Sequence, residues 1–233
     1  MNIERELIIS LLKLTREGSV SHELINKEAK IPLQLGQKLL EKLQNDGLVY
    51  ARNGFVQAES IQRLKLAVRA IELGADVERV SSVLEWHEFE NMAAIALERN
   101  GYAVQGNLRF KHAGRKLEVD VVGCKKPVVI SIDCKHWRHG MSPSVLKKIA
   151  EEQRERTKAL ADSLPNPAVK IEFASWEMVI LIPAVLSFTV GRHKLCDGVP
   201  VVPMLQLQDF ISQVPVYVNS LEHFQRTLRT GRL

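Results

Sequence analysis

The chain has 233 residues, of which 45% are apolar and 25% charged, with three cysteines and a formal net charge of +5. This composition is ordinary for a soluble globular protein, and it excludes a disordered tail, a collagen-like repeat and a disulfide-stapled miniprotein. The longest apolar stretch, residues 179–188, contains a proline and is too short to span a bilayer. We therefore expect no membrane partner, and the few cysteines favour a reducing, cytoplasmic location.

The first sixty residues carry apolar side chains at helical spacing, followed by a short segment of strand character. The spacing predicts helices over residues 3–16, 21–30 and 33–45. A hairpin is expected over residues 48–56, with Asn53-Gly54 as its turn. The N-terminal segment is thus predicted to be three helices and a hairpin.

This order of elements resembles winged helix-turn-helix domains, which implies that the third helix is presented to DNA. Residues 1–60 would form that domain, with Gln37 and Lys38 among the outward residues of the helix. The segment holds eight basic and eight acidic residues and is therefore neutral. A dimerisation or packing module thus stays open as an alternative to a DNA-binding one.

Residues 61–84 are predicted to be a helical linker, and a further helix is expected from about residue 84 to Asn100. From Tyr102 on, the pattern changes to strands separated by one long helix. Strands are expected over residues 102–108, 117–122, 128–134, 178–182 and 199–205, and helices over 144–162 and 208–213. This alternation predicts an α/β domain over residues 85–233.

Basic charge is concentrated in residues 101–150, which hold ten basic and three acidic side chains, a net charge of +7. Such a block suits a polyanion, most simply nucleic acid, although a solvated basic face without a partner has the same composition. Candidate contacts with DNA are the side chains before and after the acidic strands, namely Lys111, Arg115, Lys116, His136, Trp137 and Arg138. The alternative for residues 111–116 is a solvated basic turn, and the alternative for residues 136–138 is an ordinary loop.

Two neighbouring predicted strands carry acidic residues near their ends. Asp133 and Lys135 are two positions apart, so their side chains lie on one face of a strand. Burying either charge without a partner would cost several kcal/mol, roughly, so the pair calls for an explanation. Together with Asp120 and the carbonyl of Cys134, Asp133 offers hard oxygen ligands for Mg²⁺, with Mn²⁺ as a substitute. Lys135 would orient an attacking water or stabilise a phosphate in the transition state.

Asp120 followed by Asp133-x-Lys135 across a hairpin resembles the signature of the PD-(D/E)xK nuclease superfamily. The resemblance implies a restriction-endonuclease-like fold, with a central mixed sheet flanked by helices, and Mg²⁺-dependent cleavage of phosphodiesters. Val119 stands where the signature has proline. Glu118 shares a strand face with Asp120 and could replace it as a ligand or simply pair with a lysine.

Two further features support this resemblance. The run Phe89-Glu90, an apolar helix and then Gly101-Tyr102 resembles Mrr-type restriction endonucleases and archaeal Holliday-junction resolvases, which implies that Glu90 belongs to the active site. Gln153 falls inside the apolar face of the helix at 144–162 and needs partners there. Related nucleases carry a helix glutamine facing the metal site, while a hydrogen-bonded core glutamine is the alternative.

Mrr-type proteins also join an N-terminal winged helix to a nuclease domain. The predicted function is therefore a Mg²⁺-dependent DNA endonuclease acting in repair, recombination or restriction-type defence. A homodimer is expected, because cutting two strands takes two sites. The alternatives are a nucleic-acid-binding protein that retains the nuclease fold without catalysis, and a scaffold or transcription factor that works through its winged helix.

Two other groups of residues are not expected to take part in catalysis. Cysteines and histidines at 134, 136, 139 and 196 lack the spacing of a zinc finger, so a zinc site is disfavoured. The cations of the long helix, Lys147, Lys148, Arg154 and Arg156, have glutamates within one turn. We expect all four to form a salt-bridged, exposed helix face.

Overall fold

The computed structural model describes residues 2–135, 142–166, 168–169, 176–187 and 195–228. The chain divides into two compact units, Met1–Met92 and Ala93–Leu233, and the division falls inside the helix α6 (Trp86–Arg99). The segment predicted to be a helical linker, residues 61–84, does not form a separate linker. Its helix α4 (Ser60–Glu72) packs against α1 (Ile3–Leu14) and buries Leu66 and Ala67, so this segment is part of the first unit.

The first unit contains the predicted helices and hairpin in the predicted order. After α1 come β1 (Val20–Ser21), α2 (His22–Ala29), α3 (Leu33–Asn45), β2 (Tyr50–Arg52), β3 (Phe55–Gln57), α4 and α5 (Val77–Ser81). The three strands form a small antiparallel sheet in the order β1-β3-β2. Asn53 and Gly54 both adopt positive φ at the hairpin turn, which confirms the turn that the Asn-Gly pair predicts.

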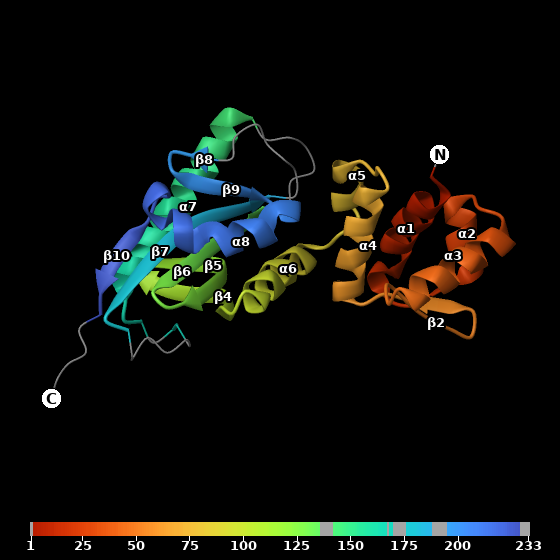
Figure 1. The fold of residues 1–233 in the computed structure, drawn as a ribbon, viewed down its shortest axis with the longest axis horizontal. Helices are drawn as coiled ribbons and strands as arrows, with labels where there is room; N and C mark the ends of the chain where they lie inside the picture. The colour runs from red at the N-terminus through yellow and green to blue at the C-terminus, as the bar shows by residue number, and fades with distance from the viewer. Residues whose placement is uncertain (1, 136–141, 167, 170–175, 188–194, 229–233) are drawn as a thin grey trace. The chain divides into compact units, whose positions relative to one another are not determined.

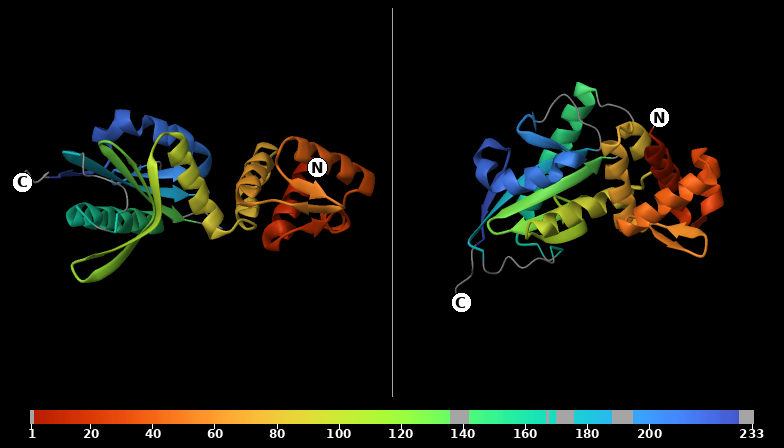
Figure 2. Two further views of the ribbon diagram at one scale, coloured as in Figure 1. Left: turned by 90° about the horizontal axis from the view of Figure 1, so that it is seen from below. Right: turned by 45° about the vertical axis from the view of Figure 1, so that its right-hand side comes forward.

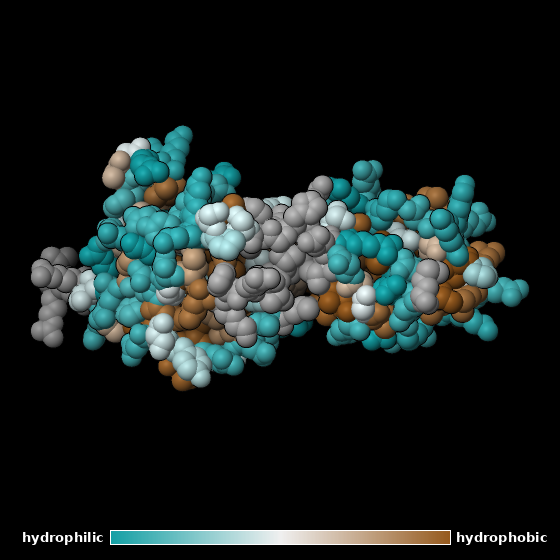
Figure 3. All heavy atoms as spheres, turned by 90° about the horizontal axis from the view of Figure 1, so that it is seen from above, coloured by the Kyte–Doolittle hydropathy of each residue, from teal (hydrophilic) through white to brown (hydrophobic). Residues whose placement is uncertain are grey.

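Several large apolar side chains of the first unit reach its surface. Leu24, Leu33, Tyr50 and Phe55 are each about half exposed, and the last two lie on the hairpin strands. Figure 3 shows one face of the molecule, on which apolar groups are interspersed among polar ones. The core of this unit lies beneath and includes Leu7, Ile25 and Leu40.

The contact between α2 and α3 depends on a glycine. A Cβ atom at Gly36 would lie 1.6 Å from Oδ1 of Asn26, whose buried amide group has no hydrogen-bond partner among the described residues. We expect Gly36→Ala to lower the free energy of unfolding by about 1–3 kcal/mol, the usual cost of overpacking. Urea denaturation would measure the loss. Adding Asn26→Ala removes the clashing atoms and should recover stability, whereas a Gly36→Ala protein as stable as the wild type would contradict this packing.

The second unit is an α/β fold built on a mixed seven-stranded sheet. Its strands are β4 (Ala103–His112), β5 (Arg115–Lys125), β6 (Val128–Lys135), β7 (Met178–Ser187), β8 (Leu195–Cys196), β9 (Val199–Pro203) and β10 (Phe224–Thr227). The order is β4-β5-β6-β7-β9-β8, and β10 pairs with the start of β7. β4, β5 and β6 are antiparallel neighbours, whereas β6, β7 and β9 run parallel.

Helices cover both faces of this sheet. The long helix α7 (Pro143–Ser163) lies along one face, and α8 (Leu207–Tyr217) lies on the other (Figures 1 and 2). The C-terminal part of α6 packs where β5 has Gly123, because a Cβ atom there would meet the side chain of Leu97 at 2.7 Å. Beneath α7, the core gathers Val129, Leu160 and Leu181. The predicted fold class, a mixed sheet flanked by helices, is confirmed for this unit.

Some elements are longer than the sequence predicts. β4 and β5 form one extended hairpin whose turn is Ala113-Gly114, both residues having positive φ. The strand β10 was not predicted, and it forms by pairing antiparallel to β7 from Phe224↔Leu181 to Thr227↔Met178. No helix in the described part of the chain combines the length and the apolar character needed to cross a bilayer.

Candidate active site

The site predicted from the sequence lies where two strands separate. β5 and β6 pair from Lys125↔Val128 to Val121↔Ile132, and the pairing ends there. β6 continues to Lys135 by pairing with β7 alone. Asp120 directly precedes Val121 and is the first residue of β5 that no longer pairs with β6. Its Oδ2 accepts a hydrogen bond of 2.7 Å from the backbone N–H of Cys134. Because the two strands separate here, the half-buried carboxylate of Asp120 can contact the backbone at the end of β6.

Asp133 is the buried acid of the site, with 2% of its surface exposed. Lys135 Nζ lies 2.9 Å from its Oδ2 and 3.1 Å from its Oδ1. Arg156 Nη1 donates to Oδ1 over 2.6 Å. The prediction that Asp133 and Lys135 share one face of the strand is confirmed by this contact. Two cations compensate the cost of taking this carboxylate out of water.

Gln153 connects α7 to the same strand. Its side chain is fully buried, and Nε2 donates to the carbonyl of Ser131 at 2.7 Å and to Ser131 Oγ at 3.1 Å. Its Oε1 accepts from Arg156 Nη1 at 3.1 Å. Gln153 is therefore a satisfied core glutamine and, through Arg156, also a neighbour of Asp133. The contacts confirm a hydrogen-bonded core glutamine, and a role of Gln153 at a metal site stays a prediction.

The expectation of an exposed Arg156 is wrong. Its side chain keeps only 22% exposure and points at Asp133, whereas Arg154 forms the expected surface pairs with Glu151 and Glu155. The helical spacing could have revealed this difference. Arg156 is three residues from Gln153, so the two share a face of α7, and the long arginine side chain reaches past the helix to the strand.

Two other candidates, Glu118 and Glu90, form different contacts. Glu118 pairs with Arg109 at 2.8 Å on the exposed hairpin, which favours its reading as a simple ion pair. Glu90 lies in the part of α6 that belongs to the first unit, and its carboxylate accepts a hydrogen bond from the indole of Trp86. The role of Glu90 in catalysis therefore stays a prediction.

The predicted DNA contacts fall into three groups. Lys111 and Lys116 are cross-strand partners at the tip of the β4–β5 hairpin, and Arg115 follows at the turn, all three exposed. Gln37 and Lys38 are exposed on α3, as expected. The third group, His136, Trp137 and Arg138, lies outside the described residues.

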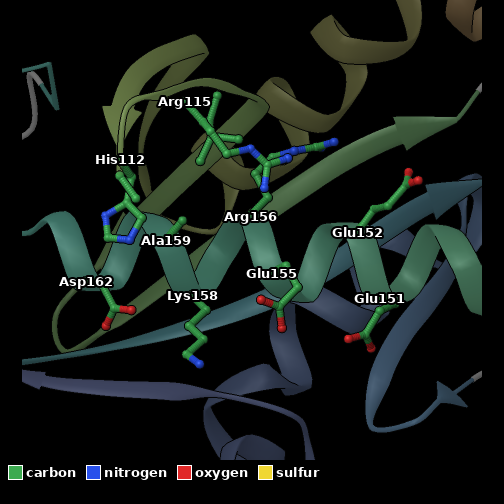
Figure 4. A pocket seen from close by; sticks show the side chains of 11 residues that line it. His112, Arg115, Glu151, Glu152, Glu155, Arg156, Lys158, Ala159 and Asp162 are labelled. Atoms are coloured by element: carbon green, nitrogen blue, oxygen red, sulfur yellow. The ribbon is translucent and has the colours of Figure 1, made fainter.

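A pocket of about 590 Å³ lies between the hairpin tip and α7 (Figure 4). His112 and Arg115 contribute from the hairpin, and Arg156 contributes from the helix. Arg156 therefore contributes both to this pocket and to the contact with the buried carboxylate of Asp133. The sequence alone did not indicate a pocket here.

The donor set fits a hard divalent cation. Asp120 lies in the middle of β5 and Asp133 near the end of the neighbouring β6, and the backbone of Cys134 lies between Asp133 and Lys135. No cluster of three or more His, Cys, Asp and Glu side chains is present in the described residues, so the protein would offer two carboxylates and a carbonyl. Burial, together with the charge of Asp197, raises the pKa of the Cys196 thiol.

The fold and the site together define an α/β protein with a buried Asp–Lys–Arg cluster at the end of a central strand. No family profile matches the chain, and no curated protein matches it. Among solved structures, protein VC1899 from Vibrio cholerae is similar, with 15% sequence identity and a TM-score of 0.43. The similarity covers 94% of this chain and 52% of that protein, so this chain spans about half the length of that protein.

Proposed function

We propose that this protein is a Mg²⁺-dependent DNA endonuclease that hydrolyses phosphodiester bonds. The observation that carries the proposal is the Asp133–Lys135 contact on β6, with Asp120 at the point where β5 stops pairing with β6. A buried ion pair adds little to stability compared with apolar residues of similar size. Charged clusters of this kind are more typical of functional sites.

The residues have separable roles in this proposal. Asp120, Asp133 and the carbonyl of Cys134 would hold Mg²⁺, which when bound supplies Lewis-acid stabilisation of the charge on the phosphate. The Lys135 ammonium orients the attacking water and donates to a phosphoryl oxygen as negative charge develops there. Gln153 fixes α7 against β6 through Ser131 and so supports the position of Asp133.

The order of elements also supports the proposal. The second unit and the helix before it follow the order helix, three antiparallel strands, helix and parallel strand, from α6 through β4, β5, β6 and α7 to β7. The acidic residues lie on the second and third of these strands, in agreement with a resemblance to PD-(D/E)xK nucleases. The resemblance also motivates the assignment of Glu90.

The first unit is proposed to be a winged helix that binds DNA. Its order of α1, β1, α2, α3, β2 and β3, with the small sheet ordered β1-β3-β2, supports this assignment. Gln37 and Lys38 on α3 would contact DNA. A homodimer is part of the proposal, because one site of this kind cuts one strand at a time.

Cleavage of a substrate panel tests the proposal. Linear duplex, single strand, flap and four-way junction would each be incubated with Mg²⁺, with Mn²⁺ or with EDTA. We expect cleavage in both metals and none in EDTA, with the preferred substrate separating repair from defence. Binding without cleavage on every substrate would contradict the proposal and favour a non-catalytic nucleic-acid-binding protein.

A further inference from the structure

Arg156 uses only part of its hydrogen-bonding capacity. The contacts to Asp133 Oδ1 and to Gln153 Oε1 are both made by one nitrogen, Nη1. In the part of the chain that the structure describes, Nε and Nη2 donate to no protein acceptor. A guanidinium carries five N–H donors in a rigid fork suited to carboxylate and phosphate. Most of the donors of Arg156 are therefore free while its charge stays next to Asp133.

The free side of Arg156 lines the pocket between the hairpin and α7. Arg115 lines the same pocket from the hairpin, and Figure 4 shows the two arginine side chains toward the same side of it. No carboxylate pairs with Arg115 within the described residues. Two guanidinium groups that line one pocket can both donate to an anion bound in it. The two arginines thus make the pocket suitable for binding an anion.

The acidic residues of the pocket form ion pairs with cations other than Arg115 and Arg156. Each of them already has a cationic partner: Glu151 and Glu155 pair with Arg154, Glu152 with Lys148 and Asp162 with Arg226. In Figure 4, Glu155 and Asp162 extend from the side of α7 away from Arg115. Among the described residues none of these carboxylates pairs with Arg115, so its guanidinium can donate to a bound phosphate.

We propose that Arg156 is a positioning residue that exchanges Asp133 for a backbone phosphate of the nucleic acid, held jointly with Arg115. This inference rests on the proposed nuclease function and adds regulation to that site. Without nucleic acid, Arg156 occupies Oδ1 of Asp133 and opposes the binding of a divalent cation there. A phosphate in the pocket draws the guanidinium away and leaves that oxygen to the metal. Metal binding and nucleic-acid binding are then coupled, and the coupling is reciprocal.

The proposal predicts effects of opposite sign on two binding measurements that need no cleavage. In Arg156→Gln, Mn²⁺ titrated without nucleic acid and followed by electron paramagnetic resonance should bind about tenfold more tightly than in the wild type, within the range typical of coupled sites. Duplex DNA titrated in EDTA and followed by fluorescence anisotropy should bind more weakly. The slope of log affinity against log salt should fall by about one, for one lost phosphate contact.

Arg154→Gln is the matched control, because it removes the same charge from the same helix but from pairs with Glu151, Glu155 and Glu222, none of which contacts Asp133. It should leave the affinity for Mn²⁺ unchanged. Arg156→Lys keeps the charge without the fork, so its Mn²⁺ affinity should stay near that of the wild type. Unfolding of both Arg156 variants, seen by circular dichroism, would make the residue purely structural and overturn the inference.

The remaining outcomes separate this inference from the proposed function. A wild-type protein that binds neither Mn²⁺ nor DNA would remove the nuclease proposal itself. A wild-type protein that binds both, with an Arg156→Gln variant whose Mn²⁺ affinity is unchanged or weaker, would leave the nuclease proposal intact and overturn the role of Arg156. Tighter Mn²⁺ binding together with weaker DNA binding supports the exchange.

Discussion

Replacing Lys135 by methionine is expected to lower the rate of metal-dependent DNA cleavage by about 10²- to 10³-fold, the usual effect of removing one donor that stabilises charge in a transition state. The ammonium lies 2.9 Å from Asp133 and keeps 25% exposure, so it can also face a phosphate. Methionine retains the apolar stem of the side chain. Asp133 keeps Arg156 as a partner, so the buried carboxylate is not left alone and the fold should survive.

The measurement compares single-turnover cleavage by the two proteins on the best substrate of the panel. Lys147→Met is the matched control, because Lys147 is an exposed lysine of α7 that pairs at the surface with Asp197. The control should cleave like the wild type. Full activity in folded Lys135→Met protein would remove Lys135 from the mechanism and, with it, the central argument for a nuclease.

The largest effect on stability is expected in the first unit, at the buried ion pair of Arg63 and Glu88. These residues are 4% and 1% exposed, and Arg63 Nε lies 2.5 Å from Glu88 Oε1. Arg63 also donates to the carbonyls of Leu12 and Val83 and to Thr15 Oγ1. The guanidinium thereby joins α1, α4, the start of α6 and the residues just before it.

Arg63→Met should lower the free energy of unfolding by about 3–5 kcal/mol, because it leaves the Glu88 carboxylate buried without its counter-charge. The double variant Arg63→Met/Glu88→Met removes both charges and should be more stable than Arg63→Met alone. Chemical denaturation of the three proteins measures both differences. A double variant no more stable than the single one would show that the bonds to the backbone carbonyls, and not the ion pair, hold these elements together.

The local sequence pattern predicted most of the elements correctly, because these elements follow from periodicity and turn chemistry. The strand at residues 128–134 is observed as Val128–Lys135, and the helix at 144–162 as Pro143–Ser163. Asn53-Gly54 made the hairpin turn predictable, since both residues accept positive φ. The strand β10 could not be predicted, because it has no pattern of its own and depends on pairing with β7.

The sequence predicted only those features of the candidate site that depend on the spacing of residues within one helix or strand. Alternation along β6 places Asp133 beside Lys135, and helical spacing puts Gln153 on the buried face of α7. Neither pattern states that α7 lies over this strand. The contact between Arg156 and Asp133 joins residues 23 positions apart on different elements, and it reversed the expected exposure of Arg156.

The same distinction applies to Glu88 and Glu90 on α6. Periodicity shows which side chains share a helix face, but both glutamates lie near the edge of the apolar face. Packing of α4 supplied Arg63 and made Glu88 the buried acid, whereas Glu90 bonds to Trp86. The sequence thus determined the elements, the Asp–Lys pair and the buried glutamine, because backbone geometry repeats along the chain. Tertiary structure alone decided the partner of each charge. Packing brings together residues from different elements, and no repeating spacing in the sequence predicts which of them will meet.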